Sequence, residues 1–149
     1  MKKLLGILIL GMFFSASQAQ IKDPVRWKYE AVKKSADTYE IVITATVEKP
    51  WHIYSQNTGA GGPVPTSITF KKNPLVTVGG KTIEVGKLQK VYDNNFKTEV
   101  LYYSGQVFFK QMVKLRGNVK TNISGTVEYM VCDDQQCLPP TKKAFDIKL

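Results

Sequence analysis

Two cysteines are the residues whose type and spacing best suit chemistry in this chain. Cys132 and Cys137 are its only cysteines, and four residues separate them. That spacing can bring two Cα atoms within the roughly 4.4–6.8 Å that a disulfide needs. Closing so short a loop stabilises the fold by only about 2 kcal/mol, whereas a structural staple would more naturally join distant strands. The spacing therefore favours a bond that opens and closes, although paired cysteines in exported proteins are usually structural.

The charges around the pair suit a slow nucleophile. Asp133 and Asp134 lie between the cysteines, and reactive thiols usually occupy electropositive surroundings. We infer that the thiols are sluggish alone and are activated by a docked partner. Beyond Cys137, Pro139 and Pro140 are expected to stiffen the chain.

Metal binding is the alternative chemistry for these sulfurs, with His52 as a third soft ligand. His52 is the only histidine, which excludes a blue-copper site with two histidines, and the chain has no second close cysteine pair of the kind found in structural zinc sites. We therefore expect no cofactor. His52 and Tyr54 share side-chain parity and are candidates to lie beside the sulfurs, where the imidazole would tune their pKa and the hydroxyl would hydrogen-bond a thiolate. A surface histidine and an ordinary half-buried strand tyrosine are the alternatives.

Alternating apolar and polar residues predict the strands that must position this pair. The alternation covers residues 25–31, 39–48, 107–116, 122–131 and 145–149, with a period of two. Turn signals separate the runs, among them Gly79-Gly80, Asp93-Asn94-Asn95 and Ser104-Gly105. The pattern predicts an all-β chain folded as an antiparallel β-sandwich of immunoglobulin type, with a barrel as the alternative.

Strand parity places the first cysteine. If the alternation of residues 122–131 continues, Cys132 shares a face with Ser124, Thr126 and Glu128. Its sulfur is then expected to point away from the main core, where a partner thiol can reach it. A bulge would reverse this expectation.

The start of the chain predicts export. Lys2 and Lys3 precede an apolar run, and Ser17-Gln18-Ala19 resembles a cleavage site, so residues 1–19 are interpreted as a signal peptide and residues 20–149 as one domain. We expect a periplasmic protein in an oxidising compartment. The formal charge of +9 is spread over scattered lysines, and no motif supports nucleic-acid binding.

Three stretches resemble one family. The first comprises Val127-Glu128-Tyr129 before the cysteine pair and Leu138-Pro139-Pro140 after it; the second is the aromatic stretch Trp51-His52-Ile53-Tyr54, and the third runs from Tyr92 to Val100. They are similar to the N-terminal periplasmic domain of the disulfide interchange protein DsbD. The resemblance covers most of the mature chain. One departure is the cysteine spacing, since the family pair often has five intervening residues.

This resemblance implies an immunoglobulin-like fold and a shuttle of electrons. Such domains are reduced by a thioredoxin-like domain and a membrane-embedded donor, and they reduce a periplasmic disulfide isomerase or a cytochrome c maturation protein. It also implies that Cys137 forms the mixed disulfide and Cys132 resolves it. An aromatic of the Asp93–Phe96 cap loop would shield the pair, with Phe96 favoured and Tyr92 as the second candidate.

Two functions from different classes follow. The first is a periplasmic thiol–disulfide carrier, a component of protein-disulfide reduction. The second is a non-enzymatic secreted binding module in which the disulfide only shapes a loop.

Overall fold

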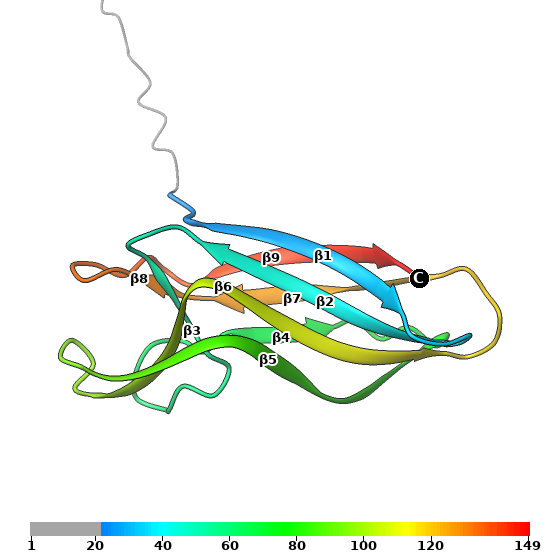
Figure 1. Ribbon diagram of the computed structural model, residues 1–149, viewed down its shortest axis with the longest axis horizontal. Coiled ribbons are helices and arrows are strands. Elements are labelled where there is room, and N and C mark those ends of the chain that lie inside the picture. The colour runs from blue at the N-terminus through cyan, green and yellow to red at the C-terminus, as the bar shows by residue number, and fades with distance from the viewer. Residues whose placement is uncertain (1–21) are drawn as a thin grey trace, which may run out of the picture.

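The computed structural model describes residues 22–149, which form strands, turns and loops without a helix (Figure 1). The predicted signal peptide, residues 1–19, lies outside the described residues. In the described part of the chain, no helix has the length and apolar character needed to cross a membrane.

Two antiparallel sheets pack face to face. The larger sheet contains β1 (Val25–Lys33), β2 (Thr38–Val47), β6 (Thr98–Leu115), β3 (His52–Tyr54) and β8 (Val131–Cys132) in that order, and β5 (Val76–Asp93) also pairs with β6. The smaller sheet has the order β4 (Ser67–Phe70), β7 (Asn122–Tyr129) and β9 (Thr141–Lys148). This arrangement confirms the predicted immunoglobulin-like sandwich and not the barrel.

Strand β6 connects the body of the sandwich to one of its ends. Along one edge it pairs with β5, and along the other it pairs first with β3, through Tyr102–Ser104, and then with β2, through Gln106–Lys114. Gly105 lies between the two partners with φ of 82°, a left-handed conformation that glycine adopts without steric cost. The change of partner carries β3, and β8 beyond it, to the end of the molecule at the left of Figure 1.

The core lies between the sheets and follows the predicted alternation. Ile41 and Ile43 of β2, Phe109 of β6 and Ile123 and Val127 of β7 are at most 1% exposed. Fully burying a side chain of this size stabilises the fold by about 1.5–3 kcal/mol. Trp27 of β1 packs on this core, with its ring centroid 5.0 Å from that of Tyr129.

Two predicted turns are wrong. Gly79 and Gly80 lie inside β5, where the register against β6 shifts between Gly79 and Ile83. Ser104 and Gly105 lie inside β6. Glycine within a strand often marks a bulge or bend and not an end. Strand β5 therefore continues through Gly79 and Gly80, and β6 begins well before the predicted alternating run 107–116.

Candidate functional site

The two cysteines form a disulfide at the base of a short hairpin. Their Cα atoms are 4.0 Å apart, and the two residues face each other as a β-bridge. The Leu138 N–H donates to the Val131 carbonyl, and the Asp133 N–H donates to the Gln136 carbonyl, each at 2.9 Å. The cysteines are thus a non-hydrogen-bonded pair between two bonded pairs, the arrangement in which opposed Cα atoms come closest. This explains a separation below the expected range.

Asp133 fixes the tip of the hairpin. Its Oδ1 accepts hydrogen bonds from the backbone N–H groups of Gln135 and Gln136, at 2.9 and 2.8 Å. These hydrogen bonds lower the pKa of the Asp133 carboxyl, so a negative charge stays beside the disulfide at neutral pH.

The chain changes sheets just before the first cysteine. Strand β7 ends at Tyr129 in the smaller sheet, and β8 begins at Val131 in the larger one, where Cys132 pairs with His52 and Val131 with Ile53. Val131 and Ile53 contribute to the main core, whereas Cys132 belongs to a separate cluster.

The parity argument is therefore right in one respect and wrong in another. Cys132 does point away from the main core, but it is only 2% exposed. Residues 122–131 are not one strand with a solvent-facing side, because the crossing at Met130 places Cys132 beneath other side chains.

A second, smaller cluster surrounds the disulfide, and we call it the disulfide cluster. Tyr54, Val100 and Cys132 are buried in it, and four partly buried residues pack against them: Phe96, Tyr102, Met130 and Cys137. The Phe96 ring stands edge-on to the Tyr54 ring, with centroids 6.4 Å apart. Of the two cysteines, Cys137 is the more exposed.

The loop between β5 and β6 brings Phe96 to this cluster. Asp93 Oδ1 accepts hydrogen bonds from the N–H groups of Asn95, at 2.8 Å, and Phe96, at 3.2 Å. Lys97 then adopts φ of 54° and returns the chain to β6. Phe96 faces the cluster as a result, while Tyr92 is 62% exposed. Of the two candidate aromatics, the geometry favours Phe96.

His52 and Tyr54 lie next to each other on the disulfide side of β3. The His52 Nε2 is 3.3 Å from the Tyr54 hydroxyl, and the imidazole centroid is 4.3 Å from that of Tyr102. Burial lowers the pKa of His52, against the opposing effect of the Asp93, Asp134 and Asp133 carboxylates. Burial also raises the pKa of Tyr54. Both groups are therefore uncharged at neutral pH.

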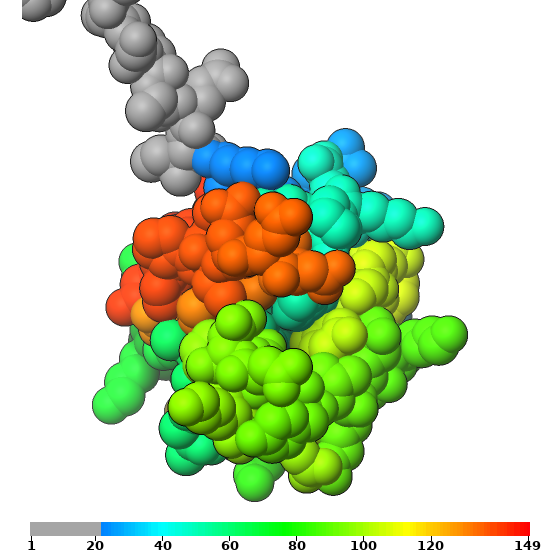
Figure 2. Space-filling view, turned by 90° about the vertical axis from the view of Figure 1, so that its left-hand side faces the viewer, coloured from blue at the N-terminus to red at the C-terminus, as the bar shows by residue number. Residues whose placement is uncertain are grey.

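A groove of about 310 Å³ runs between the hairpin and the β5–β6 loop. In Figure 2 the orange hairpin and the green loop face each other across it, with the teal of the β3 region between them. Its lining comprises His52, Val91, Tyr92, Asp93, Asn94, Asn95, Tyr102, Asp133 and Asp134. Three carboxylates and no lysine or arginine line the groove, so a partner that enters it meets negative charge.

Of the predicted site residues, the structure brings together Cys132, Cys137, His52, Tyr54 and Phe96 near one face of β3 and β8, with Asp93 and Tyr92 at the groove. Pro139 belongs to neither the disulfide cluster nor the groove; it is exposed, and its carbonyl accepts a hydrogen bond from Thr141 Oγ1 at 3.2 Å.

In residues 22–149 no three His, Cys, Asp or Glu side chains gather to hold a metal ion.

Sequence reasoning missed Tyr102, Val100 and Met130. Tyr102 is the direct cross-strand partner of Tyr54, a contact set by register between segments far apart in the chain. The aromatic pair Tyr102-Tyr103 was the available signal, because alternate residues of a strand face opposite sides. Tyr103 faces the main core, and Tyr102 faces the disulfide cluster.

Comparisons with known proteins agree with this architecture. The chain resembles the N-terminal periplasmic domain of ScsB from Proteus mirabilis, with a TM-score of 0.61 and 19% identity over 84% of this chain and 46% of that one. It also resembles the reduced N-terminal domain of DsbD from Neisseria meningitidis, with a TM-score of 0.55 and 15% identity over 81% of this chain and 83% of that one. The chain thus spans less than half of the ScsB chain, and these likenesses show the fold. No curated protein sequence matches the chain.

A family model described as the N-terminal part of the thiol:disulfide interchange protein DsbD matches residues 18–149. That match takes in both cysteines, the β3 aromatics and the β5–β6 loop. The chain therefore belongs to the family of DsbD N-terminal domains, which take part in thiol–disulfide interchange.

Proposed function

We propose that this chain is a periplasmic thiol–disulfide carrier whose Cys132–Cys137 pair takes electrons from a thioredoxin-like domain, itself supplied by a membrane-embedded donor. The reduced pair then passes them to a periplasmic disulfide isomerase or a cytochrome c maturation protein. Residues 1–19 would export the chain, and residues 20–149 would form the working domain. The observation that carries the proposal is a disulfide on the outer face of the larger sheet, with Cys137 the more open of its two sulfurs.

The proposed chemistry has two halves. A donor thiolate attacks the Cys137 sulfur, the Cys132–Cys137 bond breaks, and Cys132 leaves as a thiolate. The donor's second thiolate then attacks the mixed disulfide, so the donor becomes oxidised and both cysteines of this chain become reduced. In the second half, the Cys137 thiolate attacks a target disulfide. Cys132 attacks the resulting mixed disulfide, which restores the pair and releases the target with two electrons.

The surroundings of the pair favour exchange inside a complex over exchange in the free domain. Neutral His52 brings no positive charge to stabilise a thiolate, and Asp93, Asp133 and Asp134 line the groove. Thiolates form less readily near such carboxylates. In the proposal, Phe96 shields the bond until a docked partner displaces the β5–β6 loop, while His52 and the Tyr54 hydroxyl orient the exposed sulfur.

Trapping tests this proposal. A Cys132→Ser variant keeps the attacking thiol and lacks the resolving one, so it is expected to accumulate a covalent complex through Cys137, which mass spectrometry of periplasmic extracts identifies. Cys137→Ser is the matched control and should trap little, because Cys132 is only 2% exposed. Equal trapping by both variants, or none by either, would contradict the assignment.

The burial of Cys132 also favours the second candidate, a secreted binding module with a structural disulfide. Replacing both cysteines with serine separates the two functions. A binding module keeps its partner after the replacement, and a carrier loses electron transfer completely.

A further inference from the structure

A hollow of about 510 Å³ opens at the end of the sandwich opposite the disulfide. Figure 1 shows this end at the right, where β5 begins and β6 ends. The lining comes from both sheets: Phe70 at the end of β4, residues 71–74 after it, Val76 to Val78 at the start of β5, Arg116 after β6, and Ile123 of β7. Small-molecule sites in proteins commonly have volumes of about 300–1,000 Å³.

The interior of this hollow is apolar. Val76 and Ile123 are buried, Phe70 packs on the main core, and Val78 is 40% exposed. A neighbouring hollow of about 380 Å³ shares Phe70 and Val78 and continues to Ile68, and these three side chains form its apolar strip. The rest of its lining is mostly polar and comprises Gln56, Asn57, Gly80, Lys81, Thr82 and Gln111. Both follow the gap between β4 and β5, each of which pairs with one strand only in the described chain. The two hollows therefore form an elongated cleft along the open side of the sandwich.

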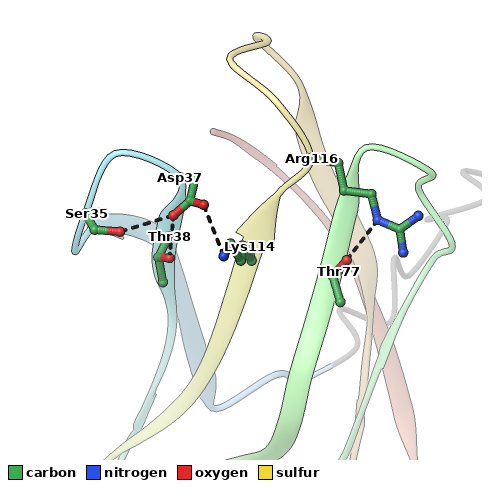
Figure 3. A network of polar contacts seen from close by, with 6 residues as sticks. All are labelled: Ser35, Asp37, Thr38, Thr77, Lys114 and Arg116. Carbon is green, nitrogen blue, oxygen red and sulfur yellow. Dashed lines mark hydrogen bonds and ion pairs between the residues drawn. The ribbon is translucent and has the colours of Figure 1, made fainter.

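Positive charge surrounds the larger hollow. Lys71, Lys72 and Arg116 line it, and no Asp or Glu does. Within residues 22–149 none of these three cations takes part in an ion pair. Lys114 at the same end does form an ion pair, because its Nζ lies 3.3 Å from Asp37 Oδ2 (Figure 3).

Arg116 is held in place at this hollow. Its Nε donates to Thr77 Oγ1 at 3.0 Å (Figure 3), and its backbone N–H donates to the Leu75 carbonyl at 2.8 Å. A guanidinium fixed through Nε still presents its terminal N–H groups, whose fork matches a carboxylate.

We propose that this cleft binds a single-chain amphiphile with an anionic head, of the class of long-chain carboxylates. The carboxylate pairs with Arg116 and the two lysines, and the alkyl chain lies over Phe70 and Val78 toward Ile68. Apolar lining with a few convergent charged groups is the usual composition of a small-molecule site. The site is separate from the disulfide, and its occupancy does not depend on the carrier function.

Titration of the whole mature protein with decanoate below its micelle concentration tests the proposal. We expect saturable binding, with amide chemical-shift changes confined to residues 68–82, 116 and 123. Acetate has the head without the tail, and decyltrimethylammonium has the tail with the opposite charge. Neither is expected to shift these amides. Equal binding of either compound, or no saturable binding of decanoate, would overturn the proposal.

Charge-removing variants show whether decanoate binding depends on the lysines of the hollow or on the overall positive charge of this end of the protein. Lys71→Gln with Lys72→Gln should weaken decanoate binding by about five- to tenfold, since each exposed pairing contributes modestly. Lys33→Gln with Lys34→Gln removes the same charge at the same end but outside the hollow, and should change binding by less than about twofold at physiological salt. Val78→Glu places a carboxylate in the cleft and should abolish binding. The amide spectrum of each variant confirms that it folds.

Vesicles distinguish a free amphiphile from a lipid surface. We expect phosphatidylglycerol vesicles to compete weakly with decanoate, because the alkyl chain must enter the cleft. A protein that binds these vesicles but not decanoate, or a control pair that weakens decanoate binding as much as the Lys71 and Lys72 pair, would assign the charge to a surface and refute the cleft.

Discussion

Cys132 and Cys137 have different surroundings although they are bonded to each other. Cys132 is buried under Tyr54 and Val100, whereas Cys137 lies toward the open side of the hairpin. An attacking thiolate must approach a sulfur along the S–S axis, so accessibility decides which sulfur it meets. The division of roles proposed for the two cysteines rests on this difference in exposure.

His52 supplies a prediction about pH. Its pKa is lowered mainly by burial, so between the usual value near 6.5 and the lowered one the unfolded chain binds more protons than the folded chain. Its contribution to stability is complete above about pH 6.5 and is lost as the pH falls through the lowered pKa. We expect the free energy of unfolding to decrease in this window, as measured by urea denaturation across pH.

The control is His52→Gln, which should flatten the pH dependence in that window. A His52 imidazole that titrates at or above 6.5 by NMR would contradict the burial argument. An unchanged pH profile in the variant would assign the dependence to other groups.

At the scale of single residues, the sequence predicts which face of a strand a side chain occupies better than it predicts which side chains it contacts. His52 and Tyr54 were expected on one side of a strand, and they lie there. Their contact with Tyr102 depends on the register between β3 and β6, which a local pattern does not contain. The contact of Phe96 with Tyr54 likewise depends on a loop conformation set by Asp93.

The β5–β6 loop brings Phe96 to the disulfide cluster, and we propose that it limits the access of thiols to the Cys132–Cys137 bond. Phe96→Ala removes the ring that packs on the disulfide cluster, so we expect reduction by a small thiol such as dithiothreitol to accelerate several-fold. The rate is measured by quenching with an alkylating reagent and mass spectrometry.

Tyr92→Ala is the matched control, since Tyr92 lies at the end of β5, close to Phe96 in the chain, and is 62% exposed. Its rate should equal that of the unmodified chain. A Phe96→Ala rate that is also unchanged would show that the loop does not limit access.

The Cys132–Cys137 hairpin supplies a prediction about stability. Its ring is short, so replacing both cysteines with serine should lower the free energy of unfolding by about 2 kcal/mol in the chain-entropy model. The fold should persist, because the main core excludes both cysteines. Urea denaturation with circular dichroism measures the difference, and a variant that fails to fold would show that the bond holds the hairpin and β8 in place.

The limits of element prediction have a physical cause. Alternation located β1 and β2 closely, because each lies in one sheet along its length, and it located only the second half of β9. It treated β7 and β8 as one strand, since the crossing at Met130 leaves the alternation of apolar residues intact. Glycines inside β5 and β6 were interpreted as turns because a bulge and a turn use the same residue.

Across the whole molecule, the groove at the disulfide end and the larger hollow at the opposite end are lined by opposite charges. Carboxylates line the groove beside the disulfide. The hollow at the opposite end is lined by cations that form no ion pair among residues 22–149. The formal charge of +9 refers to the whole chain and conceals this separation. A partner that enters the groove beside the disulfide therefore meets negative charge on a protein that is basic as a whole, and the part of the partner that enters should carry positive charge.

The fold as a whole was predictable from the sequence, because short alternating strands with frequent turns have few compact solutions. The different packing of the two faces of the larger sheet was not predictable from the sequence. Its inner face packs on the smaller sheet, while at one end its outer face carries a second cluster built from β3, β6, β8 and the β5–β6 loop. Such a cluster depends on contacts between distant segments that no single stretch encodes.

The central claim is that the Cys132–Cys137 bond exchanges with other thiols. Equilibrating the mature protein in glutathione buffers of graded ratio, followed by acid quenching and mass spectrometry, measures its reduction potential directly. The account predicts reversible reduction with a potential above about −300 mV, in the range of exchanging pairs. A potential well below about −300 mV, with the bond intact at every ratio, would indicate a structural disulfide and contradict the carrier function.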